Sequence, residues 1–165
     1  LVEGVRRWCA HLYAQTQGAG IVLCGHSAGG HLMGLLMSSL EGGEPPEEGV
    51  RAGIGLSSVF DLSPLLETGL NQALRLDAEE ARSLSPIHWM PVRDRPVIAA
   101  VGADESGEFL RQSRDFTKVW KEKGASIRCW EIPQANHFTI VDPLSDPDSA
   151  LVDVIVGLAM GSQSN

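Results

Sequence analysis

The segment that most constrains this chain is Gly25-His26-Ser27-Ala28-Gly29, which places one serine between two apolar runs. The run at residues 21–24 has the length and composition of a buried strand, and the run that begins at His31 has those of a buried helix. The sequence therefore predicts a strand, a sharp turn and a helix, with Ser27 at the turn. Glycines in such a turn let the backbone pass close to its neighbours and hold the serine hydroxyl above the strand.

A G-x-S-x-G sequence between a strand and a helix is typical of the nucleophile elbow of α/β-hydrolases. It predicts Ser27 as a catalytic nucleophile. It also predicts an α/β fold with a mostly parallel sheet and helices on both faces. The alternative is a glycine-rich turn that only packs a helix against a strand.

The rest of the chain continues the alternation of helices and strands that this fold requires. We predict helices over residues 1–17, 106–123 and 148–160, and strands over residues 51–57, 95–102 and 126–132. Residues 41–49 are rich in Gly, Pro and Glu and indicate a solvated loop. Neither an internal repeat nor a linker divides the sequence, so we expect a single domain over residues 1–165.

Residues 60–90 are predicted to form a cap over the substrate. Short helical pieces broken at Pro64 and Gly69 are followed by a capping box, Asp77 with Glu80, that opens a further helix to Leu84. Five leucines would give the cap an apolar underside: Leu65, Leu66, Leu70, Leu74 and Leu76.

Composition limits the partners and the compartment. The net charge of −8 disfavours nucleic acids and anionic membrane surfaces, which are bound mainly by clustered Lys and Arg. Neither a charged-then-apolar leader nor an apolar run of about 18 residues occurs, so we expect no export signal and no membrane span. Three cysteines without C-x-x-C spacing suggest core positions in a reducing, cytoplasmic setting, and neither disulfides nor zinc: Cys9, Cys24 and Cys129.

A serine hydroxyl is a poor nucleophile at neutral pH, so Ser27 needs a histidine to take its proton and an acid to orient that histidine. In α/β-hydrolases these residues follow the serine in the order acid, histidine, at the carboxyl ends of strands. Asp104 and His137 each follow a predicted strand directly and in that order. We therefore predict Asp104 as the acid and His137 as the base, with Glu105 as the nearest alternative acid.

The other acids after Ser27 fit the role less well. Asp61 also follows a strand, but it precedes an apparent helix start and suits capping. Asp94 precedes its strand and would lie at the wrong edge of the sheet, and Asp142 comes after His137.

The other histidines are also poorer candidates for the base. His11 and His31 fall on predicted helices, and His88 has no strand leading to it. His26 adjoins the nucleophile, so we expect it to line or pack the pocket. Acidic and histidine residues show no metal-ligand spacing, so metal-dependent hydrolysis is not supported.

Four segments together resemble kynurenine formamidase (arylformamidase), and the resemblance covers nearly the whole chain. The segments are residues 25–32, residues 60–66 with Ser85-Pro86, residues 101–113 and residues 136–141. The most specific is residues 105–113, Glu-Ser-Gly-Glu-Phe-Leu-Arg-Gln-Ser. The resemblance implies hydrolysis of N-formyl-L-kynurenine to L-kynurenine and formate, without a cofactor, by Ser27, Asp104 and His137.

Enzymes of this fold stabilise the oxyanion with two backbone N–H groups. One belongs to the residue after the nucleophile, here Ala28, and the other to an H-G-G-type loop, which is absent from the 26 residues before Ser27. We therefore expect the chain to lack the amino-terminal part of the fold and to have reduced activity. Two other functions stay open: a carboxylesterase or lipase-like hydrolase, and a catalytically silent hydrolase-fold fragment that serves as an interaction module.

Overall fold

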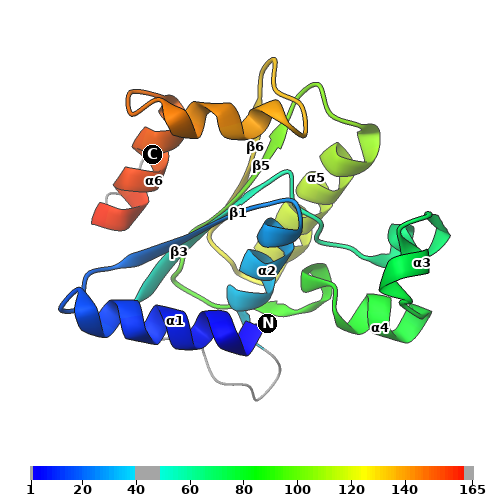
Figure 1. Cartoon of the computed structure of the whole chain (residues 1–165), viewed down its shortest axis with the longest axis horizontal. Helices are drawn as coiled ribbons and strands as arrows, with labels where there is room; N and C mark the ends of the chain where they lie inside the picture. The colour runs from blue at the N-terminus through cyan, green and yellow to red at the C-terminus, as the bar shows by residue number, and fades with distance from the viewer. Residues whose placement is uncertain (1, 40–48, 162–165) are drawn as a thin grey trace.

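The computed structural model describes residues 2–39 and 49–161 and contains a four-stranded parallel sheet (Figure 1). The strands lie in the order β1 (Ile21–His26), β3 (Val50–Leu56), β5 (Val97–Gly102) and β6 (Ile127–Ile132). A separate antiparallel pair joins β2 (Ser38–Ser39) to β4 (Met90–Pro91). The predicted parallel sheet is confirmed, because each of its strands begins and ends within two residues of the expected bounds.

Helices cover both faces of this sheet, as the sequence predicts. On one face lie α1 (Val2–Gln15), α2 (Ala28–Leu36) and α5 (Gly107–Glu122), and on the other lies α6 (Ala150–Met160) (Figure 1). The two faces form separate cores.

Alternation along β5 supplies both cores from one strand. Val97 and Ala99 join the cluster that contains Phe116 of α5, whereas Ile98 joins the cluster that contains Leu151 of α6. Successive side chains of a strand point to opposite faces, and here both faces are covered. An unbroken apolar run is therefore the expected sequence of this strand.

The segment predicted as a cap forms short helices that project from the body of the molecule (Figure 1). They are η1 (Ser63–Glu67), α3 (Asn71–Leu74), α4 (Ala78–Ser83) and η2 (Pro86–His88). Pro64 lies in the first turn of η1 and starts that helix, so the predicted break at this residue is wrong.

The predicted capping box and the exposure of the cap leucines are both visible in this segment. Asp77 accepts the N–H of Glu80 at 2.8 Å, and the Glu80 carboxylate accepts the N–H of Asp77 at 3.2 Å, which confirms the capping box. Leu70 and Leu74 are 64% and 51% exposed, so they do not pack into the body of the molecule.

Two further expectations concern loops and cysteines. Most of the predicted loop at 41–49 lies outside the described residues. Cys9 is buried, which confirms its core position, but Cys24 is exposed. Cys24 lies on β1, which pairs only with β3 among the described strands, so the core prediction is wrong there.

Within the described ranges, no helix has the length and apolarity to cross a bilayer.

Candidate active site

Ser27 sits in a sharp, strained turn between β1 and α2. Its backbone has φ 54° and ψ −116°, a conformation that costs a non-glycine residue about 1–3 kcal/mol. The turn is fixed from both sides: the Ser27 N–H donates to the Leu56 carbonyl at 2.9 Å, and the His31 N–H donates to the Ser27 carbonyl at 3.1 Å. The predicted strand, turn and helix around Ser27 are confirmed, and the strain is typical of a nucleophile elbow.

Two glycines allow the close approaches that this turn requires. A Cβ at Gly25 would collide with the carbonyl of Gly29, and a Cβ at Gly30 would collide with the side chain of Ser58. A Cβ at Gly29 would meet no atom within 4 Å. The prediction of a close approach is therefore confirmed for Gly25 but not for Gly29. The second close approach is made by Gly30.

The contrast between Gly30 and Gly29 gives a matched test of packing under the elbow. We expect Gly30→Ala to lower the free energy of unfolding by about 1–3 kcal/mol, because a methyl group forced into a filled space displaces Ser58. Gly29→Ala is the control, since both glycines lie in α2 and the change in helix propensity is the same. Urea denaturation measures both variants, and equal losses of stability would contradict the proposed packing.

His137, in the loop after β6, lies against a buried glutamate. Its Nδ1 is 3.2 Å from Oε2 of Glu105, whose side chain is 1% exposed. Asp104 is exposed, and it reaches the same loop through its backbone, whose N–H donates to the Ala135 carbonyl at 3.0 Å. The structure therefore brings Glu105, not the predicted Asp104, to His137.

The turn after β5 explains why the second acidic residue faces inward. The Glu105 N–H donates to the Gly102 carbonyl at 3.2 Å, so the chain folds back on the end of the strand. Gly102 permits this close approach because it has no side chain. A Cβ at this position would collide with the carbonyl of Ala135 in the loop that carries His137. The two loops are thus held together by backbone contacts, and the Glu105 side chain is enclosed between them.

The second carboxylate oxygen of Glu105 is also engaged. Oε1 accepts a short hydrogen bond from the Ser57 hydroxyl and another from the Gly102 N–H at 3.1 Å. Ser57 is fully buried at the end of β3, and β3 lies between the strands that lead to Ser27 and to Glu105. The sequence analysis missed Ser57; the signal was a polar residue directly after a buried strand, at the edge of the sheet where Ser27 and Glu105 lie.

Aromatic rings surround His137 and connect its loop to the elbow. His26 Nε2 lies 2.7 Å from the His137 carbonyl, so this nitrogen carries the proton and donates. The rings of His26 and His137 are 4.8 Å apart, and the ring of Phe109 lies 4.4 Å from that of His137. Phe138, 79% exposed, packs edge-on against His137 at 5.6 Å. As expected, His26 packs the site.

Ser27 and Ala28 directly follow His26, whose ring bonds the His137 carbonyl. Within the described ranges the Ser27 hydroxyl makes no hydrogen bond, to His137 or to any other residue. Ala28 is the first residue of α2, where a backbone N–H has no acceptor inside the helix. The role of Ala28 as an oxyanion donor stays a prediction.

Other candidate residues have structural partners elsewhere. Asp61 accepts the Ser63 N–H at 3.0 Å and lies 3.3 Å from Arg111, but the N-cap of η1 is Leu62, so the predicted capping role of Asp61 is wrong. Burial alone would raise the pKa of Asp61, but these hydrogen bonds outweigh it and hold the pKa below its usual value. His31 Nδ1 pairs with the Val59 carbonyl at 2.9 Å, and burial lowers the His31 pKa. The described residues contain no group of three or more His, Cys, Asp or Glu suited to a metal ion.

No family model matches the chain. The chain is 29% identical to a kynurenine formamidase from Salmo salar and 26% identical to one from Danio rerio, in each case over 94% of this chain and 55% of the relative. It thus spans about half the length of the curated relatives that it matches.

Comparison with solved structures identifies the fold. A candidate thioesterase from Silicibacter sp. tm1040 superposes with a TM-score of 0.78 at 30% identity, covering 94% of this chain and 57% of that one. An esterase from Thermogutta terrifontis, Est2, superposes with a TM-score of 0.68 at 21% identity, covering 98% and 63%. The chain therefore has the α/β-hydrolase fold, and in sequence it resembles the kynurenine formamidases.

Proposed function

We propose that this chain carries the catalytic centre of a serine hydrolase that cleaves N-formyl-L-kynurenine to L-kynurenine and formate. The observation that supports this most is the buried Glu105 carboxylate against Nδ1 of His137, in a loop bonded to the strained Ser27 elbow. The sequence similarity to kynurenine formamidases supports the choice of a formamide as substrate.

The proposed reaction has two steps. In the first, Ser27 Oγ attacks the formyl carbon while Nε2 of His137 takes its proton; the C–N bond then breaks, and the same nitrogen returns the proton to the departing aryl amine. In the second, a water molecule gives a proton to His137 and attacks the formyl-serine ester. Formate leaves and Ser27 recovers its hydrogen, so the chain needs no cofactor.

Glu105 serves as the orienting acid in this proposal. Because its carboxylate faces Nδ1, it favours the tautomer in which Nε2 is free to accept the serine proton. It also stabilises the imidazolium that forms during attack. Ser57 and the Gly102 N–H hold the other oxygen, so the carboxylate cannot turn away.

The oxyanion site requires a second donor besides the Ala28 N–H. No His-Gly-Gly occurs among the 26 residues before Ser27, so in this proposal the second N–H comes from a part of the enzyme outside this sequence. The length of the relatives is compatible with this, since the chain spans 55% of the Salmo salar formamidase. We further propose that residues 60–90 act as the cap of a single domain, with Leu70 and Leu74 available to cover a substrate.

A comparison of two substrates tests the proposed function. We expect the chain to cleave N-formyl-L-kynurenine, followed by absorbance of the released amine, with a higher kcat/KM than p-nitrophenyl butyrate. A preference for the butyrate ester would favour the carboxylesterase alternative, which the structural likeness to Thermogutta esterase 2 supports. Hydrolysis of neither substrate, together with no labelling of Ser27 by a fluorophosphonate, would favour the catalytically silent alternative.

Loss of the Ser57 hydroxyl should weaken catalysis through Glu105. We expect Ser57→Ala to lower kcat about tenfold with little change in KM, because the hydroxyl bonds the acid and not the substrate. An unchanged kcat in Ser57→Ala would mean that Ser57 only fills space.

A further inference from the structure

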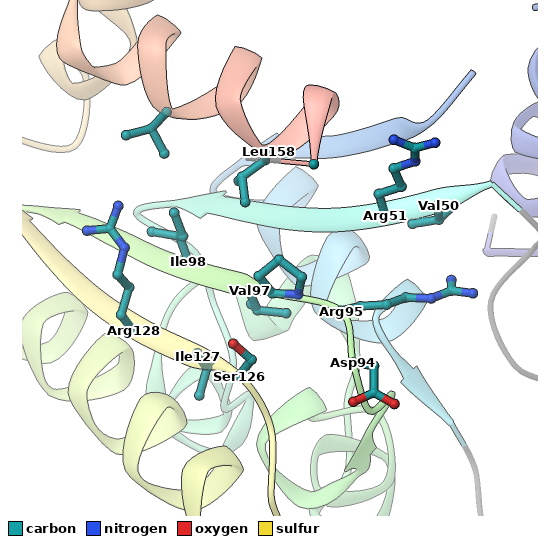
Figure 2. A pocket seen from close by; sticks show the side chains of 13 residues that line it. Val50, Arg51, Asp94, Arg95, Val97, Ile98, Ser126, Ile127, Arg128 and Leu158 are labelled. Atoms are coloured by element: carbon teal, nitrogen blue, oxygen red, sulfur yellow. The ribbon is translucent and has the colours of Figure 1, made fainter. Parts of the chain in front are cut away.

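A concave site lies at the edge of the sheet opposite Ser27 and Glu105. It is a pocket of about 450 Å³ between α6 and the first residues of β3, β5 and β6 (Figure 2). Pockets of this size are typical of small-molecule sites. The six residues of β5 separate it from the turn that carries Glu105, a distance of roughly 17–20 Å. The pocket therefore does not belong to the catalytic site.

The floor and one wall of this pocket are aliphatic. Val97 and Ile98 of β5 are 2% and 3% exposed, and Ile127 of β6 is 5% exposed. Leu158 and Val154 of α6 form the wall above them, as Figure 2 shows for Leu158. This part of the pocket can bury the hydrocarbon body of a ligand, but it offers no polar partner to it.

Three arginines surround the same pocket and come from three different segments. Arg51 lies on β3, Arg95 precedes β5 and Arg128 lies on β6, and Figure 2 shows Arg128 on one side of the lining and Arg51 with Arg95 on the other. Among the described residues that line the pocket, Asp94 is the only acidic one. The surroundings of the pocket are therefore locally basic in a chain whose net charge is −8.

The arginines are partly held in place. Arg51 Nη1 lies 3.4 Å from the Ala159 carbonyl of α6, and the Arg128 guanidinium lies 5.3 Å from the centre of the Trp130 ring. Guanidinium groups bind carboxylates through paired, charge-assisted hydrogen bonds.

We propose that this pocket binds an organic carboxylate with an apolar body. The body would lie on Val97, Ile98 and Leu158, and the carboxylate would pair with Arg128 at the rim. An inorganic anion would leave the aliphatic floor unused, and a neutral apolar molecule would leave the arginines unused. This binding site is independent of the proposed hydrolysis, because none of its lining residues belongs to the catalytic group.

Calorimetry with three probes on the full chain tests the ligand class. We expect saturable binding of octanoate, with 1-octanol and inorganic phosphate each at least about tenfold weaker. Chemical-shift changes on octanoate binding should centre on Ile98, Ile127 and Leu158. Equal binding of octanoate and 1-octanol, phosphate binding as tight as octanoate binding, shifts centred elsewhere, or no saturable octanoate binding would each overturn the proposal.

Charge reversal at one arginine tests the site. Arg128→Glu should weaken octanoate binding about tenfold or more, whereas Arg7→Glu, on the exposed surface of α1, should change it less than twofold. Both variants change the net charge equally, so equal weakening would show a general charge effect and overturn the proposal. Leu158→Gln tests the aliphatic wall separately and should also weaken octanoate binding. These variants are compared by octanoate binding and not by hydrolysis, so a failure of the binding proposal can be distinguished from a failure of the proposed hydrolysis.

Discussion

Ser27→Ala should lower kcat/KM for N-formyl-L-kynurenine by a factor of about 10⁴–10⁶. The hydroxyl forms the covalent bond to the formyl group, and no other nucleophile can replace it in the elbow. The loss should appear in kcat, because alanine leaves the substrate-binding surface unchanged. Initial rates at saturating and limiting substrate measure the two effects separately.

The fold of this variant needs its own check, since Ser27 adopts a left-handed φ of 54°. Circular dichroism and urea denaturation should show little change, because alanine and serine bear similar strain there. Ser58→Ala is the matched control: it removes a neighbouring buried hydroxyl that has no hydrogen-bond partner and should leave the rate within about threefold. Retention of more than a tenth of the activity by Ser27→Ala would show that another residue is the nucleophile.

The second large effect separates two adjacent acids. Glu105→Gln should lower kcat by about 10²–10⁴, since an uncharged amide neither selects the right tautomer of His137 nor stabilises its protonated form. Asp104→Asn should leave kcat within about twofold, because the Asp104 side chain is exposed and only its backbone reaches the histidine loop. Both substitutions remove one charge and preserve side-chain size, so each controls for the other.

The opposite pattern would contradict the geometry of the turn. If Asp104→Asn reduced kcat strongly and Glu105→Gln did not, the acid would be the one that the sequence predicts. Glu105 is buried, and in Glu105→Gln the amide oxygen must still accept the Ser57 and Gly102 hydrogen bonds. Thermal denaturation of both variants therefore shows whether a lower kcat comes from a loss of the fold.

The elements of the fold were predictable because their signals are local. The strands carry continuous apolar runs, and the capping box at Asp77 and Glu80 fixes the start of α4. The order of serine, acid and histidine along the chain pointed to His137 and to the turn after β5, and the structure places this histidine against Glu105 of that turn. Each of these signals depends on residues close together in sequence.

Choosing between Asp104 and Glu105 required tertiary information. The two residues are adjacent, and which carboxylate faces inward depends on the approach of Gly102 to Ala135, more than thirty residues away in sequence. The same holds for Ser57, whose partner lies 48 residues later, and for Gly30, whose neighbour is Ser58. Contacts of this kind are set by the order of strands in the sheet, which no local pattern contains.

Labelling with a fluorophosphonate tests most directly whether Ser27 is activated by His137. The reagent reacts with an activated serine hydroxyl and requires neither the natural substrate nor its cap. Peptide mass spectrometry should find one adduct, on Ser27, and labelling should fall by at least about a hundredfold in His137→Ala. Absence of an adduct on Ser27, or equal labelling of the wild-type chain and His137→Ala, would contradict the proposed catalytic centre.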